Sequence, residues 1–185
     1  MTRHDVPPLH GLVLAGGDST RMGQNKAALA YHGEPEVIRA YKLLGELCDR
    51  AYVSVRHHQL EDDLYADVEK IADELPGTGP AIGLLSAMHS HPGAAWLIVA
   101  CDMPLLDRAS LERLIQERDP HRAATAFMAS DGGVEPLCAI YEPVCRGAFS
   151  DAVARGYYCV RQIMKDSDVK LVPQTENATE SANTP

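Results

Sequence analysis

Trp96-Leu97-Ile98-Val99-Ala100-Cys101 is the most apolar stretch of the chain, and it ends abruptly at Asp102-Met103-Pro104. Because every position in it is apolar, both faces of a strand formed by this stretch must be covered. Helices are the elements that cover both faces of a largely parallel sheet. The stretch therefore predicts a central strand in a sheet that lies between two layers of helices.

Strands and helices alternate around this central strand. The short apolar run at 9–15 ends in Gly16-Gly17 and is predicted to be a second buried strand. Further strands are expected at 51–55, 68–72, 123–128, 136–141 and 169–172. Helices are expected at 35–48, 61–66, 82–89, 107–115, 144–154 and 160–164. This alternation is typical of an α/β domain with three layers and a mainly parallel sheet.

The length of 185 residues fits one domain, which can bury a core without disulfide or metal cross-links. We expect that domain to cover 1–185 and to end in a polar, flexible tail at 174–185. Acidic residues outnumber basic ones by 26 to 17, and the formal net charge of −9 argues against a nucleic-acid-binding face. No apolar run approaches the roughly 20 residues that span a bilayer, and the amino end lacks the apolar stretch of a secretory signal. A cytoplasmic monomer that binds no membrane is therefore expected.

The cysteines and histidines do not predict a metal site. The five cysteines form no C-x-x-C pair and mostly have apolar neighbours, so reduced, buried thiols are expected. The pairs His57-His58 and His89-x-His91 have no carboxylate or thiol at ligand spacing nearby.

The loop after the run at 9–15 has the composition of a phosphate-binding segment: Leu14-Ala15-Gly16-Gly17-Asp18-Ser19-Thr20-Arg21-Met22-Gly23-Gln24-Asn25-Lys26. The two glycines let the backbone approach an anion and turn its N–H groups toward it. Arg21 offers a fork of donors that suits phosphate oxygens, and Lys26 adds a compact, mobile charge. Neither a Walker P-loop nor a G-x-G-x-x-G turn is present. The segment predicts a triphosphate-binding loop, and the alternative is a glycine-rich turn with two surface cations.

Asp102 directly follows the central strand. In parallel sheets ligands bind beyond the carboxyl ends of the strands, which places this carboxylate opposite the glycine loop. Mg²⁺ bound with a triphosphate takes one or two carboxylates together with phosphate oxygens and waters. Asp102 is therefore the candidate metal ligand, and the alternative is a cap of a turn or helix.

A third candidate segment, Gly77-Thr78-Gly79-Pro80, leads into an expected helix. Its backbone N–H groups, or the amino end of that helix, can contact a base or a phosphate. Asp73, just upstream, can accept hydrogen bonds from the edge of a base. The alternatives are a plain loop before a helix and a solvated loop charge.

Three features together resemble the MobA-like NTP transferase family, which contains the molybdenum cofactor guanylyltransferases. They are the L-A-G-G-x-S-x-R-M-G-x-x-K segment, the G-P-x-x-G segment at 79–83, and the apolar strand that ends in C-D-M-P. Pro136-Leu137-Cys138-Ala139-Ile140-Tyr141 is similar to the family's P-L-x-A-L-Y strand. The resemblance implies a Rossmann-like nucleotidyltransferase domain. It also implies Mg²⁺-dependent transfer of GMP from GTP to the molybdopterin cofactor, which releases pyrophosphate and forms the guanine dinucleotide cofactor.

The resemblance also implies roles for individual residues. Arg21 and Lys26 would stabilise the triphosphate and the departing pyrophosphate, and Asp102 would bind Mg²⁺; these three are the expected catalytic residues. The expected nucleotide-binding residues are Leu14, Ala15, Gly16, Gly17, Lys26, Ser54, Asp73, Gly79 and Asp102. Among them, Asp73 would contact the base, and Ser54 stands where guanylyltransferases often have an asparagine near the base.

GTP and molybdopterin are the expected substrates, with transient contacts to other cofactor-synthesis proteins. Glu135, Arg161 and Asn183 are candidates for the pterin side of the site. The alternatives are a cytidylyltransferase for the same cofactor, a sugar-phosphate nucleotidyltransferase, and a nucleotide-binding module without catalysis. The L-A-G-G opening, rather than L-A-A-G, favours the guanylyl branch. Asn25, which replaces the usual acidic residue, supports the module without catalysis.

Overall fold

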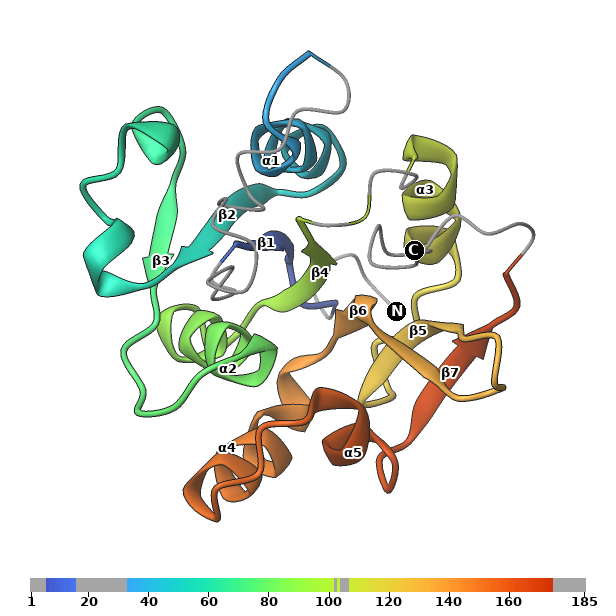
Figure 1. Cartoon of the computed structure of the whole chain (residues 1–185). Coiled ribbons are helices and arrows are strands. Elements are labelled where there is room, and N and C mark those ends of the chain that lie inside the picture. Colours follow the sequence, from blue (N-terminus) through green and yellow to red (C-terminus); the bar gives the residue numbers. More distant parts are fainter. Residues whose placement is uncertain (1–5, 16–32, 102, 104–106, 175–185) are drawn as a thin grey trace.

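Figure 1 shows a computed structural model of the chain, in which residues 6–15, 33–101, 103 and 107–174 are described. Within these residues, seven strands form one sheet in the order β3-β2-β1-β4-β6-β5-β7. The strands are β1 (Leu9–Leu14), β2 (Arg50–Val55), β3 (Lys70–Ala72), β4 (Ala95–Ala100), β5 (Ala124–Met128), β6 (Val134–Tyr141) and β7 (Val169–Val172). The strands expected from the sequence are all present, with ends shifted by no more than two residues.

The helices agree with the sequence pattern except at one place. They are α1 (Glu36–Leu47), α2 (Pro80–Ser90), α3 (Arg108–Gln116), α4 (Arg146–Ala154) and α5 (Val160–Met164), with short 3-10 turns η3 (His57–Gln59), η4 (Asp63–Tyr65) and η5 (Pro143–Cys145). The helix expected at 61–66 is wrong, because only the single turn η4 forms there. Tyr65 is the one buried residue of that turn, so a longer helix would have no apolar face to hold it. Among the helices of the described residues, none combines the length and apolar composition that a membrane crossing requires.

The sheet is mainly parallel, with one strand reversed. β1 pairs in parallel with both β2 and β4, and β2 pairs in parallel with β3. β6 runs antiparallel to its neighbours β4 and β5, and β5 pairs in parallel with β7. The carboxyl ends of β1, β2, β3 and β4 therefore lie along the same edge of the sheet, which confirms the mixed, mainly parallel arrangement expected from the sequence.

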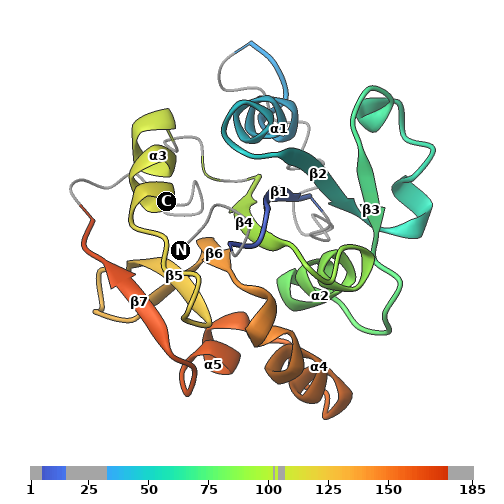
Figure 2. The same cartoon turned by 180° about the vertical axis from the view of Figure 1, so that it is seen from behind.

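Helices cover both faces of the sheet (Figure 1 and Figure 2). One apolar core lies under α1 and α3 and contains Leu97 and Val99 of β4. The other lies under α2, α4 and α5 and contains Trp96 and Ile98 of the same strand. Every residue of β4 is buried, which confirms that the most apolar stretch is a central strand between two helical layers.

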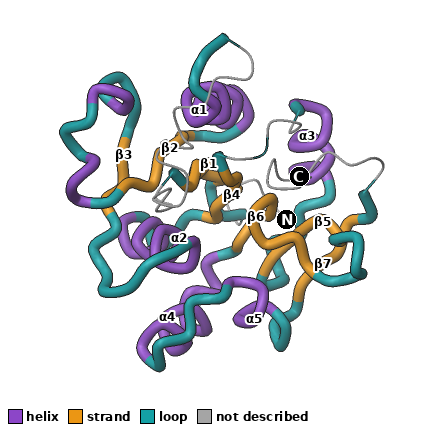
Figure 3. The backbone as a smooth tube through the Cα atoms, in the orientation of Figure 1, coloured by secondary structure: helices purple, strands orange, loops and turns teal. Residues whose placement is uncertain are grey.

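The path of the chain across the sheet reverses beside β1. From β1 the chain passes through α1 to β2 and on to β3, and α2 then returns it to β4 on the other side of β1 (Figure 3). In open α/β sheets, ligands bind beyond the carboxyl ends of the strands at such a reversal. The carboxyl ends of β1 and β4 therefore mark the place where a site is expected.

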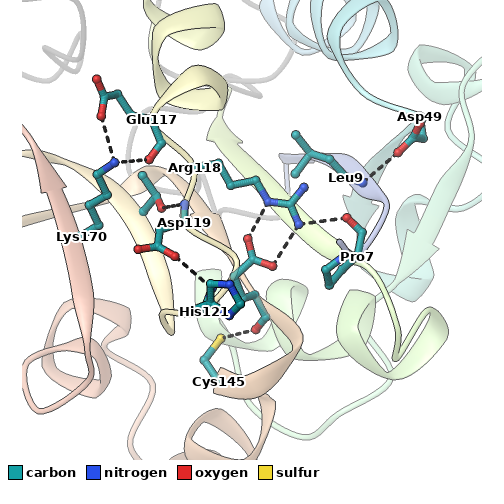
Figure 4. Close-up of polar contacts among 11 residues, drawn as sticks. Pro7, Leu9, Asp49, Glu117, Arg118, Asp119, His121, Cys145 and Lys170 are labelled. Atoms are coloured by element: carbon teal, nitrogen blue, oxygen red, sulfur yellow. Dashed lines mark hydrogen bonds and ion pairs between the residues drawn. The ribbon is translucent and has the colours of Figure 1, made fainter. Parts of the chain in front are cut away.

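Arg118, which follows α3, joins distant parts of the chain (Figure 4). Its Nε donates to Oε1 of Glu142 at 2.6 Å, and its Nη2 donates to Oε2 of Glu142 at 3.0 Å. The same Nη2 donates to the carbonyl oxygen of Pro7 at 2.9 Å. Glu142 is only 1% exposed, so its buried carboxylate is neutralised by a bidentate partner. These bonds fix the segment before β1, and thereby the start of the strand that leads to the reversal point.

Candidate active site

The end of β1 is held by hydrogen bonds on both sides. The N–H of Ala15 donates to the carbonyl oxygen of Ser54 in β2 at 3.3 Å. On the other side, the N–H of Cys101 donates to the carbonyl oxygen of Leu14 at 3.4 Å. The last described residue before the glycine-rich segment is therefore anchored between the ends of β2 and β4.

A serine and an aspartate face each other across the ends of β2 and β3. The hydroxyl of Ser54 donates a 2.8 Å hydrogen bond to Oδ1 of Asp73. Ser54 is buried, with 2% of its surface exposed, and the N–H of Asp73 donates to the carbonyl oxygen of Val55 at 2.9 Å. The parallel pairing of β2 with β3 thus brings together two polar side chains that lie 19 positions apart in the sequence.

The charge state of Asp73 depends on two opposing effects. Burial raises the pKa of its carboxyl above the ordinary value, because the charged form loses hydration. The hydrogen bond from Ser54 and the nearby charges of Arg56 and His57 lower the same pKa. The effect of burial is the larger one, so the pKa of Asp73 stays raised, and its three neighbours limit that rise. When ionised, both oxygens of the carboxylate accept hydrogen bonds.

The first turn of α2 packs against this pair. The residue before α2 is Gly79, whose φ of +102° lies in the region that favours glycine. Within α2, a Cβ atom on Gly83 would lie well under 3.0 Å from Oγ of Ser54 and 3.0 Å from Cδ2 of Leu14. The absence of a side chain at Gly83 therefore lets α2 approach the ends of β1 and β2 closely.

The structure brings several of the predicted nucleotide-binding residues together at this edge. Leu14, Ala15, Ser54 and Asp73 lie at adjoining strand ends, and Gly79 precedes the helix that packs on them. The other predicted residues lie outside the described residues: Gly16, Gly17, Arg21, Lys26 and Asp102.

Two of the residues predicted for the pterin side, Glu135 and Arg161, lie on the other half of the sheet. The β4–β6 register pairs Val99 with Cys138, and Glu135 lies three residues before Cys138 in β6. Arg161 of α5 forms an ion pair with Asp131 in the turn between β5 and β6. Asn183 lies outside the described residues.

Sequence reasoning missed a contact between α1 and the segment after β4. Arg39 pairs with Glu36 at 2.7 Å, and its Nη2 donates to the carbonyl oxygen of Met103 at 3.4 Å. The available signal was the spacing of Glu36 and Arg39, since residues three apart on a helix can form an ion pair. The contact with Met103 had no local signal, because it depends on where the sheet places the end of β4.

Residues 11–172 of the chain match the family described as the MobA-like NTP transferase domain. The chain belongs to this family. The match runs from within β1 to the end of β7 and includes the Ser54–Asp73 pair and the first turn of α2. The resemblance drawn from the sequence motifs is thereby confirmed, and the family is one of nucleotidyltransferases.

Proteins of known name agree with this assignment. Over 95% of its length, the chain is 34% identical to a molybdenum cofactor biosynthesis bifunctional protein of Synechocystis sp., and it spans about half of that relative (51%). It is 27% identical to a molybdenum cofactor guanylyltransferase of Pseudomonas fluorescens, over 96% of this chain and 90% of the relative. The crystal structure of molybdopterin-guanine dinucleotide biosynthesis protein A from Archaeoglobus fulgidus has a TM-score of 0.72 to this chain, with 21% identity and coverage of 89% and 83% of the two chains. This likeness confirms the Rossmann-like α/β fold.

Proposed function

We propose that this chain transfers GMP from GTP to the molybdopterin cofactor and releases pyrophosphate. The proposal is supported by membership of the MobA-like NTP transferase family and by relatives named for this activity. The structural observation that carries it is the pair formed by Ser54 and Asp73 at the ends of β2 and β3, on the sheet edge that also holds the carboxyl ends of β1 and β4. A carboxylate held two strands away from β1, at the same edge of the sheet, is suited to bind a base whose phosphates lie against the loop that follows β1.

Guanine suits this carboxylate better than the other bases do. Its Watson–Crick edge presents two donors side by side, N1–H and N2–H, and an ionised carboxylate only accepts hydrogen bonds. Adenine and cytosine each present one donor beside a ring nitrogen that accepts, and that nitrogen would face an acceptor. We therefore assign base recognition to Asp73 and guanine as its ligand.

The triphosphate is assigned to the segment after β1. Backbone groups of Leu14, Ala15, Gly16 and Gly17 would approach the phosphates, since this end of β1 is fixed between β2 and β4. Arg21 and Lys26 would neutralise charge that develops on the departing pyrophosphate. A terminal phosphate of the pterin attacks the α-phosphorus of GTP, a reaction that depends on alignment and charge stabilisation rather than on covalent help from the protein.

The divalent ion is assigned to Asp102, and we propose that it is Mg²⁺. The N–H of Cys101 bonds to Leu14, so the end of β4 that precedes Asp102 is tied to the end of β1, where the phosphate segment begins. A carboxylate there fits Mg²⁺, which is bound in nucleotide sites by one or two carboxylates together with phosphate oxygens. When bound, Mg²⁺ supplies electrostatic stabilisation of the phosphates.

The proposal is tested by a pyrophosphate-release assay on the full chain with each of the four nucleoside triphosphates, Mg²⁺, and molybdopterin present or absent. We expect release with GTP that requires molybdopterin. Replacement of Lys26 or Asp102 by alanine should abolish release while circular dichroism shows an intact fold. Release with CTP instead of GTP would identify the cytidylyl branch. Binding of GTP without release, in protein shown to be folded, would identify a module without catalysis and overturn the proposal.

A further inference from the structure

We propose that Ser54 is a positioning residue for base recognition: its hydroxyl fixes the plane of the Asp73 carboxylate so that two parallel donors of guanine can be bound at once. This inference rests on the proposed function, because it assumes that Asp73 faces the base. It assigns Ser54 an indirect part in the nucleotide site, through Asp73 rather than through a contact of its own with the nucleotide.

The surroundings of Ser54 leave its hydroxyl little else to bind. The side chain is 2% exposed. It lies under α2, where a Cβ on Gly83 would approach both Oγ and Cβ of Ser54, the latter at 3.2 Å. A hydroxyl enclosed in this way does not reach a ligand in solution, and its 2.8 Å bond to Asp73 is the interaction that it makes.

Asp73 in turn depends on Ser54 for its orientation. Within the described ranges, the hydroxyl of Ser54 is the donor that bonds to the Asp73 carboxylate. That bond uses one acceptor direction of Oδ1, and the second direction of Oδ1 and both directions of Oδ2 stay available. A carboxylate held on one oxygen can turn less about its Cβ–Cγ bond. Its remaining acceptor directions are therefore already oriented toward a pair of donors before the base binds. Less conformational entropy of the Asp73 side chain is lost on binding.

A comparison of guanine with hypoxanthine tests whether the Asp73 carboxylate is held in the orientation that binds two donors. Guanine presents N1–H and N2–H, whereas hypoxanthine, the base of ITP, keeps N1–H and lacks the exocyclic amino group. A fixed carboxylate gains a second hydrogen bond only with guanine. A carboxylate that turns freely makes that second bond less well, so loss of the Ser54 hydroxyl should reduce the preference for GTP over ITP.

The same hydroxyl also influences protonation. The bond from Ser54 lowers the pKa of Asp73 against the effect of burial, together with the charges of Arg56 and His57. The first two turns of α2, from Pro80 to Ser86, pack over the pair and carry no titratable side chain. Removal of the Ser54 hydroxyl should therefore raise the pKa of Asp73, and a protonated carboxyl accepts donors less well.

The experiment measures binding of GTP and ITP to the full chain by calorimetry, without molybdopterin, from about pH 5 to about pH 8. In S54A, we expect GTP affinity to fall about tenfold, as for a lost hydrogen bond to a charged group. The ratio of GTP affinity to ITP affinity should decrease. GTP binding weakens as the pH falls, and in S54A this weakening should begin at a higher pH than in the wild-type chain. The matched control is T125V, which removes a buried hydroxyl that accepts from the N–H of Asp119 at 3.0 Å. T125V should change neither the GTP affinity, nor the ratio of GTP to ITP affinity, nor the pH dependence of GTP binding.

The outcomes separate the two proposals. If the wild-type chain binds no GTP, the proposed function fails and the role of Ser54 fails with it. If the wild-type chain binds GTP but S54A keeps the same affinity, base ratio and pH profile, the role of Ser54 is overturned and the proposed function stands. If S54A does not fold, S54C is measured instead, since it keeps a weak donor on a side chain only slightly larger than serine. S54C should retain more of the GTP over ITP preference than D73N, and an equal loss in both would also overturn the inference.

Discussion

Gly83 of α2 lies directly against Ser54 of β2: a methyl group at Gly83 would come well under 3.0 Å from the Ser54 hydroxyl oxygen. The hydroxyl could escape only by turning away, and it would then lose its hydrogen bond to Asp73. Helix α2 can therefore pack directly on the Ser54–Asp73 pair only because residue 83 is a glycine.

The variant G83A tests this fit. Alanine favours a helix interior over glycine by about 1 kcal/mol, but forcing a methyl group into a packed contact costs about 1–3 kcal/mol. We expect a net loss of unfolding free energy and weaker GTP binding. The control is G45A in α1, where the nearest atom to the new Cβ would be the Cβ of Ala51 at 4.0 Å. G45A should raise the melting temperature, so a G83A protein as stable as G45A would contradict the packing described here.

Much of the fold is predictable from local pattern. The apolar run of β4 predicts burial on both faces, and both cores contain its side chains. Asp107 stands just before the apolar positions of α3, where an aspartate is a favoured helix cap, and its Oδ1 accepts from the N–H of Ser110 at 2.8 Å. Such features depend on neighbours in the sequence, which is why they can be read without knowledge of the fold.

The length of the connection between β5 and β6 indicates the direction of β6. The expected strands at 123–128 and 136–141 are joined by few residues, and a parallel pair needs a crossover of about a dozen residues or more. The connection is a tight turn, in which the N–H of Ala129 donates to the carbonyl oxygen of Gly133. Loop length alone therefore indicates the antiparallel pairing of β5 and β6.

The sequence predicts candidate site residues one by one, but it does not predict how they are arranged. Asp73 and Ser54 were named separately from the sequence, and nothing local indicates that they bond to each other. That contact depends on the register of β2 against β3, which pairs Ser54 with Ile71. The role of Gly83 depends on how closely α2 packs on the sheet, which also requires the assembled fold.

The Arg118–Glu142 pair should contribute strongly to stability. Glu142 is almost fully buried, so R118M would leave a buried carboxylate without its partner, at a cost of about 3–5 kcal/mol. Denaturant unfolding measures this loss. The control is R122M, because Arg122 pairs with Asp168 at the exposed surface, and exposed pairs contribute little. Equal effects of the two substitutions would contradict the structural role of Arg118.

A second buried group, His10, should make stability depend on pH. The ring of His10 lies edge-on to Trp96 at 5.3 Å and to His91 at 5.1 Å. Burial lowers the pKa of His10 below its ordinary 6.5, and the charge of His91 adds to this shift. The unfolded chain therefore binds more protons below pH 6.5, and the free energy of unfolding should decrease as the pH falls below that value.

Thermal unfolding between about pH 7.5 and about pH 5.5 tests this sign. The variant H10F removes the titrating group and keeps a ring at the same place, so it should lose less stability over this range than the wild-type chain. The control H58F replaces an exposed histidine and should follow the wild-type curve. Wild-type and H10F stabilities that change in parallel over this range would show that His10 is not held in its neutral form.

The most direct test of the proposed function follows the phosphorus atoms of GTP. The full chain is incubated with molybdopterin, Mg²⁺ and GTP labelled at either the α- or the γ-phosphate, and the products are separated. Transfer of GMP predicts that the α label enters the pterin product as its guanine dinucleotide, while the γ label leaves as pyrophosphate. An α label that stays in GTP, or that is released as free GMP without a labelled pterin, would contradict the account.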